Sequence, residues 1–179
     1  MTNIIAISNH KGGVAKTKTC LSLGACLAEM GKTVLLIDLD PQASLTLSLG
    51  LKPESLRHAV DVALLGNTQA EYYAARSLRH VVDLVKLVRE KTNPHLTYRV
   101  LVTMYDRRNK ICHVILEQMQ ASLSAVLFKT IIEVDTKLRE SPAFGQPITL
   151  YTPNTRGAQQ YREFARELMN DGRESQAPA

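Results

Sequence analysis

Long apolar runs are missing from this chain of 179 residues. No run approaches the roughly 18 apolar residues that a membrane-spanning helix needs. The amino terminus, MTNIIAISNH, also lacks the basic start, long apolar stretch and small-residue cleavage site of a secretory signal. The sequence therefore predicts no membrane insertion and a cytoplasmic location.

Cysteine is scarce as well. The chain contains Cys20, Cys26 and Cys112, an odd number without C-x-x-C spacing. This pattern argues against a disulfide framework and against a zinc site. We expect all three side chains to be packing residues.

Charge is unevenly distributed. The formal net charge is +5, and residues 76–110 hold nine Lys or Arg against only Asp83, Glu90 and Asp106. Such a basic stretch can meet the phosphate backbone of a nucleic acid. It can equally be the solvated face of a helix whose counter-charges lie elsewhere in the fold.

The first forty residues follow a strand, loop, helix, strand pattern. Residues 3–8 and 33–38 are short apolar runs that predict buried strands, and residues 16–30 carry apolar side chains at helical spacing, followed by Gly31 as a stop. This order favours an α/β fold with a parallel sheet and a right-handed crossover.

The same alternation continues along the chain. Further helices are predicted at 44–50, 54–65, 70–90, 108–122 and, capped by Thr155, up to Met169. Further strands are predicted at 98–104, 125–132 and 147–151. Residues 1–169 would then form a single domain, and residues 170–179 a disordered tail.

The loop HKGGVAKTKTC at 10–20 lies between the first strand and the first helix. A glycine-rich loop that opens a helix turns several backbone amides toward one point, where the helix dipole adds positive potential. Lys16 and Thr17 match the end of the phosphate-binding pattern G-x-x-x-x-G-K-[ST], although His10 and Ala15 replace its glycines. The alternative is a glycine turn with incidental lysines.

The heptapeptide KGGVAKT resembles the deviant Walker A box, K-G-G-x-[GA]-K-[ST], of the ParA/MinD ATPases. The resemblance implies that ATP with Mg²⁺ is the ligand and that the chain forms a homodimer when ATP is bound. It also implies that Lys11 reaches the nucleotide held by the other subunit. The implied nucleotide-binding residues are Lys11, Gly12, Gly13, Val14, Ala15, Lys16, Thr17 and Lys18.

A second matching block is LLIDLDPQ at 35–42. The resemblance implies that Asp38 joins Thr17 in the Mg²⁺ shell and that Asp40 positions the attacking water, so that Lys11, Lys16 and Asp40 form the catalytic set. An aspartate that caps a helix or a turn before Pro41 is the other interpretation.

The carboxyl-terminal half resembles the ParA/Soj branch of partition ATPases over VLVTMYDRRN (100–109), 131–151 and 152–169. The resemblance implies that Pro153 and Asn154 line the adenine pocket. It also implies nonspecific DNA contacts by basic residues of this half, for which the candidates are Arg107, Arg108, Lys137 and Arg139. Each of these side chains can instead be an ordinary solvated residue.

The resemblance breaks near Asn67 and Thr68. Family members carry a Walker B strand ending in aspartate and a further strand there, and neither is present, which indicates an internal deletion. Asp83 and Asp135 are the available replacements for the missing aspartate. However, Asp83 falls in a helical pattern, and Asp135 falls in a stretch that resembles a different part of the family fold. Residues 3–8 would lose two central neighbours and would need to pair with 33–38, with 98–104 or with another chain.

The predicted fold is thus a P-loop NTPase-like, mainly parallel sheet flanked by helices and lacking two central strands. The predicted function is that of a nucleoid-associated, ParA-like ATPase for chromosome or plasmid partitioning, stimulated by a ParB-like partner. Two alternatives are a shortened relative that binds nucleotide or DNA without hydrolysis, and an inactive fragment. The tail lacks the basic amphipathic helix of a MinD-like membrane anchor.

Overall fold

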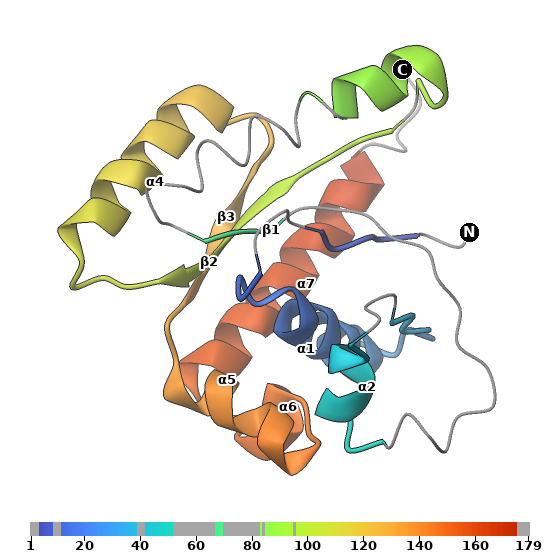
Figure 1. Ribbon diagram of the computed structural model, residues 1–179, viewed down its shortest axis with the longest axis vertical. Helices are drawn as coiled ribbons and strands as arrows, with labels where there is room; N and C mark the ends of the chain where they lie inside the picture. Colours follow the sequence, from blue (N-terminus) through green and yellow to red (C-terminus); the bar gives the residue numbers. More distant parts are fainter. Residues whose placement is uncertain are drawn as a thin grey trace. The chain divides into compact units, whose positions relative to one another are not determined.

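The computed structural model describes residues 4–8, 12–38, 42–51, 67–69, 83, 85–94 and 96–174. They fall into two compact units, whose helices and strands are drawn in Figure 1. The sheet unit comprises Met1–Lys16 and Ala63–Glu133, and the helical unit comprises Thr17–Val62 and Val134–Ala179.

The sheet unit contains three parallel strands in the order β1-β2-β3. These are β1 (Asn67–Gln69), β2 (Val100–Tyr105) and β3 (Leu127–Glu133). Residue Thr68 pairs with Val102, and Val100 pairs with Leu127. Helix α4 (Lys110–Leu123) provides the crossover from β2 to β3. The parallel α/β architecture predicted from the sequence is confirmed.

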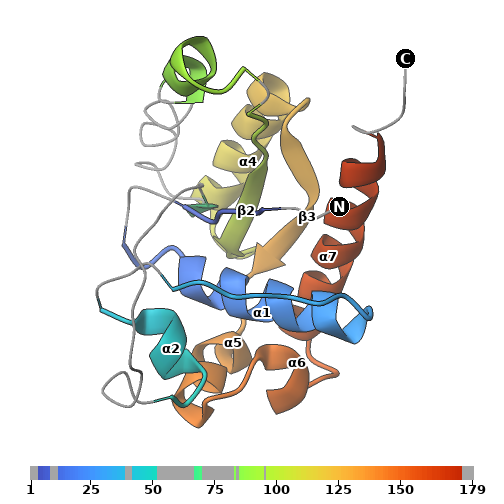
Figure 2. The ribbon, with the colours of Figure 1, turned by 90° about the vertical axis from the view of Figure 1, so that its right-hand side faces the viewer.

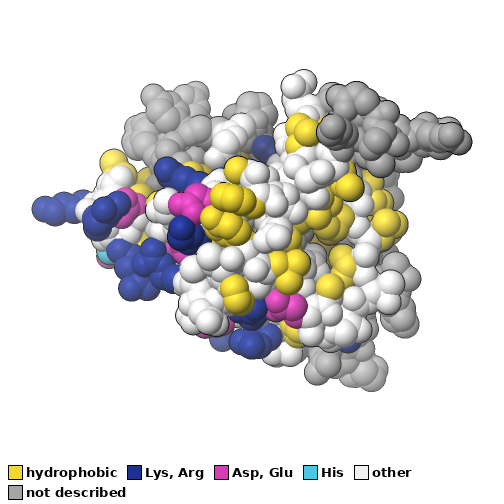
Figure 3. All heavy atoms as spheres, turned by 90° about the horizontal axis from the view of Figure 1, so that it is seen from below, with side chains coloured by type: hydrophobic (Ala, Val, Ile, Leu, Met, Phe, Trp, Pro, Cys, Tyr) yellow, Lys and Arg dark blue, Asp and Glu magenta, His cyan; other side chains and the backbone are white. Residues whose placement is uncertain are grey.

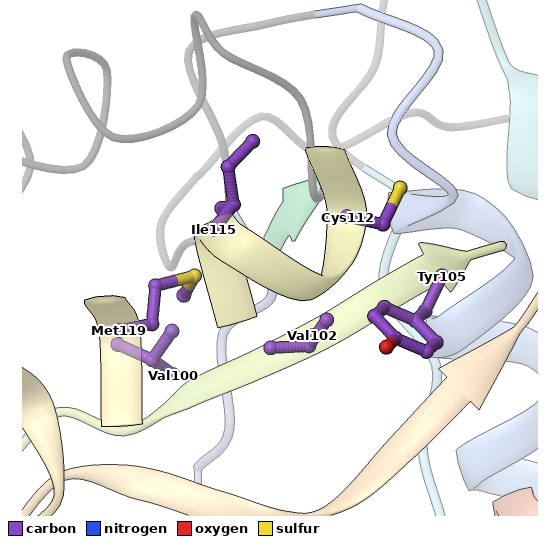
Figure 4. Close-up of a cluster of buried hydrophobic side chains, with 6 residues drawn as sticks. All are labelled: Val100, Val102, Tyr105, Cys112, Ile115 and Met119. Atoms are coloured by element: carbon purple, nitrogen blue, oxygen red, sulfur yellow. The ribbon is translucent and has the colours of Figure 1, made fainter. Parts of the chain in front are cut away.

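The core of the sheet unit lies between α4 and β2 (Figure 4). Cys112, Ile115 and Met119 recur at helical spacing on α4 and belong to one buried cluster with Val100 and Val102 of β2. Met119 lies next to Val100 (Figure 4). The side chain of Asn109 caps α4 by accepting a hydrogen bond of 3.0 Å from the amide of Ile111. Burial of Cys112 agrees with the packing role expected of the cysteines.

The helical unit contains two long helices and several short ones. They are α1 (Lys16–Glu29, of which the first residue belongs to the sheet unit), α2 (Ser44–Ser48), α5 (Thr136–Glu140), the 3₁₀ helix η2 (Ser141–Phe144), α6 (Ile148–Tyr151) and α7 (Arg156–Glu174). Gly31 ends α1 as predicted, with a left-handed φ of 75° that an L side chain rarely adopts.

Two predictions for this unit are wrong. Residues 148–151 form helix α6 rather than a strand, because Pro147, with its φ of −66°, starts a helical turn in which its carbonyl accepts from the amide of Tyr151. Helix α7 continues past Met169 to Glu174, so residues 170–174 are helical rather than part of a disordered tail. The expected tail 175–179 and the expected helix 54–65 lie outside the described residues. In the sheet unit, residues 85–90 are helical as predicted.

The predicted strands at 3–8 and 33–38 are also not formed among the described residues. Residues 4–7 and 32–38 belong to no strand, and their apolar side chains include Ile4 at 94% and Leu35 at 83% exposure. β-branched composition favours an extended backbone, but a strand also needs a run of hydrogen bonds to a neighbour, and among the described residues of these two runs only Ser8 forms a β-bridge.

Among the described residues, no helix combines the length and the apolar character needed to cross a bilayer.

Candidate phosphate-binding loop

The loop Gly12–Ala15 enters α1 in a conformation that exposes backbone amides. Gly13 and Ala15 have φ values of 76° and 63°, in the left-handed region. Alternation of right- and left-handed residues turns successive amides toward one side and creates a concave anion site. Ala15 adopts this conformation despite its Cβ, at a cost of order 1–2 kcal/mol.

Val14 anchors the loop within the sheet unit. Its side chain is buried, and its carbonyl accepts a hydrogen bond of 3.3 Å from the hydroxyl of Thr103 on β2. The loop is therefore fixed at its centre to the middle strand of the described sheet, while Gly12 and Gly13 remain exposed.

Space and unused donors remain at the glycines. A Cβ built on Gly12 or Gly13 would meet no atom within 4 Å. The amides of Gly12, Gly13 and Ala15 donate no hydrogen bond to another described residue. The first turn of α1 adds amides without intrahelical partners and the positive end of the dipole. The residues present therefore fit a phosphate group.

The side chains expected to reach that phosphate begin α1. Lys16 and Thr17 are both half-buried at its first two positions. The next residue, Lys18, is also half-buried, and burial is the main cause that lowers the pKa of its ammonium group, with the charge of Arg139 as the second cause. Lys11 lies outside the described residues.

Asp38 is the described member of the acidic pair. Its Oδ2 atom accepts hydrogen bonds of 3.0 Å from the amides of Leu45 and Thr46 and from the Thr46 hydroxyl. It therefore caps α2, which was the alternative interpretation for one aspartate of this block. Burial and then the charge of Asp38 raise the pKa of the Cys20 thiol. Asp40 and Pro41 lie outside the described residues.

Pro153 and Asn154 form an exposed turn immediately before α7. The carbonyl of Pro153 accepts a hydrogen bond of 2.6 Å from Arg162, and the carbonyl of Asn154 accepts one of 3.5 Å from Gln159. Thr155 caps the helix as predicted, because its hydroxyl accepts from the amide of Ala158 at 3.4 Å. The turn is thus held from within the helical unit.

The four expected DNA contacts are divided between the units. Arg107 pairs with the buried Glu133, and Arg108 with Asp106, in the sheet unit. In the helical unit, Lys137 pairs with Glu140 at 2.7 Å and Arg139 is exposed. Figure 3 shows acidic side chains among the basic ones on the face that it draws. These partners reduce the positive charge that Arg107, Arg108 and Lys137 present.

Asp135 caps two helices, a role that the sequence did not predict. Its Oδ1 atom accepts from the amide of Lys137 at 2.8 Å, and its Oδ2 atom accepts from the amide of Gly157 at 2.9 Å. One carboxylate thus caps both α5 and α7. An aspartate just before a helix is a visible sequence signal for the first cap, but nothing in the sequence indicates the second.

Asp83 shows the surface position expected from its helical pattern. Its side chain is 72% exposed and lies 4.0 Å from the Lys86 ammonium group. Neither Asp83 nor Asp135 is therefore arranged as a replacement for the missing Walker B aspartate.

The loop, the helix that it opens and the parallel sheet define a class of protein, the α/β nucleotide-binding domains of the P-loop type. The chain belongs to the CobQ/CobB/MinD/ParA nucleotide binding domain family, whose model matches residues 5–148. The family resemblance noted in the sequence is confirmed.

Two relatives carry the name Soj. The chain is 28% identical to the sporulation initiation inhibitor protein Soj of Bacillus subtilis, over 96% of the chain and 100% of that relative. It is 30% identical to the chromosome-partitioning ATPase Soj of Thermus thermophilus, over 92% of the chain and 94% of that relative. The first alignment spans 253 positions, so about 80 of them have no counterpart in this chain.

Solved structures share the fold. Cobyrinic acid a,c-diamide synthase from Mycobacterium smegmatis, with bound ADP and magnesium, matches with a TM-score of 0.77 at 24% identity, over 98% of this chain and 97% of that one. The septum site-determining protein MinD from Pyrococcus horikoshii, complexed with Mg-ADP, matches with a TM-score of 0.71 at 20% identity, over 94% and 96%.

Proposed function

We propose that the protein binds ATP and Mg²⁺ and acts in DNA partitioning in the manner of a ParA protein. The observation that carries this proposal is the open loop at the start of α1, with left-handed Gly13 and Ala15 and with amides of Gly12, Gly13 and Ala15 that no other described residue engages. The family match and the Soj relatives support the same conclusion.

The loop, the first residues of α1 and Asp38 have different roles in this proposal. The loop amides and the Lys16 ammonium group would hold the phosphates, and the Thr17 hydroxyl and the Asp38 carboxylate would hold the metal. When bound, Mg²⁺ neutralises phosphate charge that develops as the terminal phosphate is transferred. Asp38 is already held at the start of α2 by hydrogen bonds of 3.0 Å, so its carboxylate has a fixed orientation for that role.

The remaining roles follow from the family resemblance. Lys11 supplies a second ammonium group to the nucleotide of a partner protomer, which links dimerisation to ATP. Asp40 positions the attacking water, and Pro153 and Asn154 contact the adenine. Residues 1–169 act as one nucleotide-binding domain, from which an internal segment near Asn67 and Thr68 has been lost.

DNA is the proposed macromolecular ligand, and a ParB-like protein is the proposed stimulator of hydrolysis. Arg107, Arg108, Lys137 and Arg139 would meet phosphates without reading base sequence. Because three of these side chains have acidic partners, binding requires exchange of a carboxylate for a phosphate. This exchange favours weak, salt-sensitive binding. The proposed place of binding is the nucleoid, in the cytoplasm.

The test is DNA binding by the purified chain with and without Mg-ATP, over a range of salt concentrations. We expect ATP to strengthen binding and the logarithm of the binding constant to fall linearly with the logarithm of salt concentration. Binding that responds neither to ATP nor to salt would contradict the proposed function.

A second candidate function is a binding module that holds nucleotide without hydrolysing it. The observation that favours it is the set of about 80 alignment positions without a counterpart, together with a sequence that lacks the Walker B aspartate. Turnover of ATP under saturating conditions distinguishes the two functions. Activity that Asp40→Ala abolishes would reject the non-hydrolysing module.

A further inference from the structure

Two aromatic rings are stacked on each other in the helical unit. Phe144 ends η2 and Tyr151 ends α6, and their ring centroids lie 4.9 Å apart with the ring planes inclined by 22°. Phe144 is nevertheless 64% exposed, whereas Tyr151 is half-buried. Because Tyr151 covers one face of the Phe144 ring, the exposed area of Phe144 belongs to the opposite face and to the ring edge.

The stacked rings are held in place by other parts of this unit. Helices α2, α5 and α6 all pack on η2 (Figure 2). A Cβ built on Gly145 would lie 2.9 Å from the Cα atom of Gly50, so the turn that follows Phe144 packs closely on the end of α2. The hydroxyl of Tyr151 donates a hydrogen bond of 3.0 Å to Oε2 of Glu140 on α5. Contacts within the protein therefore fix the orientation of both rings.

Two basic side chains belong to the same short stretch of chain. Lys137 and Arg139 are both exposed and lie on α5, which leads directly into η2. The Lys137 ammonium group donates a hydrogen bond of 2.7 Å to the same oxygen of Glu140 that accepts from the Tyr151 hydroxyl. This bond is the main cause that raises the pKa of Lys137, so its charge persists at neutral pH. A positive charge therefore lies one carboxylate away from the stacked rings.

An exposed aromatic ring beside cations is typical of surfaces that bind single-stranded nucleic acid. An unpaired base stacks on the ring, and the cations contact the phosphates of the strand. The bases of a duplex are stacked on one another, so a duplex can use the cations but not the ring. A peptide that binds the ring through apolar side chains would gain little from the two cations. The combination of ring and cations therefore favours a single strand.

We propose that the stacked rings and the two cations of α5 bind single-stranded DNA, with one unpaired base on the open face of the Phe144 ring. Tyr151, Phe144 and the base then form a continuous stack, while Lys137 and Arg139 contact phosphates of the same strand. Tyr151 is a positioning residue, because it orients the Phe144 ring and does not itself contact the base. The inference rests on the DNA binding of the proposed function and adds a preference for single strands to it.

Fluorescence anisotropy with labelled oligonucleotides tests this preference. The first two probes are a thymidine strand of about 15 nucleotides, within the span that a single-strand binding surface covers, and a duplex of equal length. The third probe is an abasic strand of the same length, which has the phosphates but no bases. With the full chain and Mg-ATP at one salt concentration, we expect the thymidine strand to bind most tightly.

Phe144→Leu tests the stacked ring. The variant keeps an apolar side chain at an exposed position, so thermal unfolding should be unchanged. It should weaken binding of the thymidine strand by roughly fivefold or more, the lower end of base-stacking effects. The affinities for the duplex and for the abasic strand should change by less than about twofold, because neither offers an unpaired base. The matched control Leu150→Ala shortens an exposed apolar side chain on α6 and should not change the affinity for any probe.

The salt dependence of binding separates the ring from the cations. Arg139→Gln removes one phosphate contact, so the slope of the logarithm of the binding constant against the logarithm of salt concentration should become shallower by roughly 0.7 for the thymidine strand. Phe144→Leu should leave this slope unchanged, because stacking on an uncharged ring releases no counterions. An equal change of slope in the two variants would overturn the assignment of Phe144 to a base.

The outcomes for this inference and for the proposed function are distinct. Binding of strand and duplex that Phe144→Leu leaves unchanged would overturn the stacking site and favour a protein partner for the exposed ring, while DNA binding would stand. Equal losses for the thymidine strand and the abasic strand in Phe144→Leu would also overturn it. Failure of every probe to bind the wild-type chain, with or without Mg-ATP, would contradict the proposed function itself.

Discussion

The hydroxyl of Thr19 lies 2.9 Å from the phenol oxygen of Tyr161, and both residues are almost completely buried. The bond joins α1 to α7 across 142 positions of sequence. Burial raises the pKa of the Tyr161 phenol far above its ordinary value, so the group remains protonated at physiological pH. The helix that carries Lys16 and Thr17 is therefore held within the helical unit by a buried polar contact.

Removal of one partner of this contact should destabilise the protein. Tyr161→Phe leaves the Thr19 hydroxyl buried without its partner, and we expect the free energy of unfolding to fall by about 1–3 kcal/mol. Urea denaturation followed by circular dichroism measures this change.

The matched control is the double variant Thr19→Val with Tyr161→Phe. Because both polar groups are then removed, its loss of stability should be smaller than the sum of the two single losses. Strictly additive losses would show that the two hydroxyl groups are not coupled.

Asp135 should be more important to stability than an ordinary helix cap. Asp135→Ala removes the acceptor for the amides of Lys137 and Gly157 together, and each cap contributes typically about 1 kcal/mol. We expect a loss near twice that of Asn109→Ala, which removes only the cap of α4. Equal losses in urea unfolding of the two variants would contradict the double cap.

The pair of Glu29 and Arg162 should make stability depend on pH. A hydrogen bond from Arg162 is the main cause that lowers the pKa of Glu29, and the guanidinium binds both carboxylate oxygens, at 2.8 and 3.1 Å. A carboxyl group whose pKa is lower in the folded protein than in the unfolded chain stabilises the fold at pH values above its unfolded pKa of about 4.3. This stabilisation is lost as the pH falls through the lower pKa of the folded state.

Glu29→Gln should therefore lower the free energy of unfolding at pH 7, by about 0.5–1 kcal/mol because the pair is partly exposed. The difference from wild type should shrink as the pH falls below about 4.3 and through the lowered pKa of Glu29. The control Asp83→Asn breaks an exposed pair of 4.0 Å and should have no measurable effect. A difference for Glu29→Gln that persists unchanged at low pH would argue against the linkage.

The Cys26 thiol should be unreactive in the folded protein. Burial is the main cause that raises its pKa to about 12, and its side chain is only 1% exposed. Since the thiolate is the reactive form, alkylation at pH 8 followed by mass spectrometry should leave Cys26 unmodified until denaturant is added. Rapid labelling of Cys26 in the native state would contradict the burial of its side chain between α1 and its neighbours.

Local patterns in the sequence predicted much of the sheet unit. The strands ending at Tyr105 and Glu133 and the helix between them were found within a few residues, because apolar periodicity is a local signal. The loop at Gly12–Ala15 was predicted for the same reason, since its glycines and lysines are adjacent in sequence.

Signals that depend on distant partners were missed or misinterpreted. Residues 33–38 have strand composition but no described strand neighbour, and Pro147 starts a helical turn in a run that alternates like a strand. The second cap made by Asp135 depends on Gly157, 22 positions away, and sequence alone does not bring the two together. Local propensity therefore predicted elements, and tertiary contacts determined their pairing.

The most direct test of the central claim is equilibrium binding of Mg-ATP by titration calorimetry, with Lys16→Ala and the control Lys86→Ala. If the loop at the start of α1 holds the phosphates, wild type and Lys86→Ala, which alters an exposed lysine, will bind equally and Lys16→Ala will show no binding. ATP affinity that is unchanged in Lys16→Ala would contradict the assignment of the phosphate site.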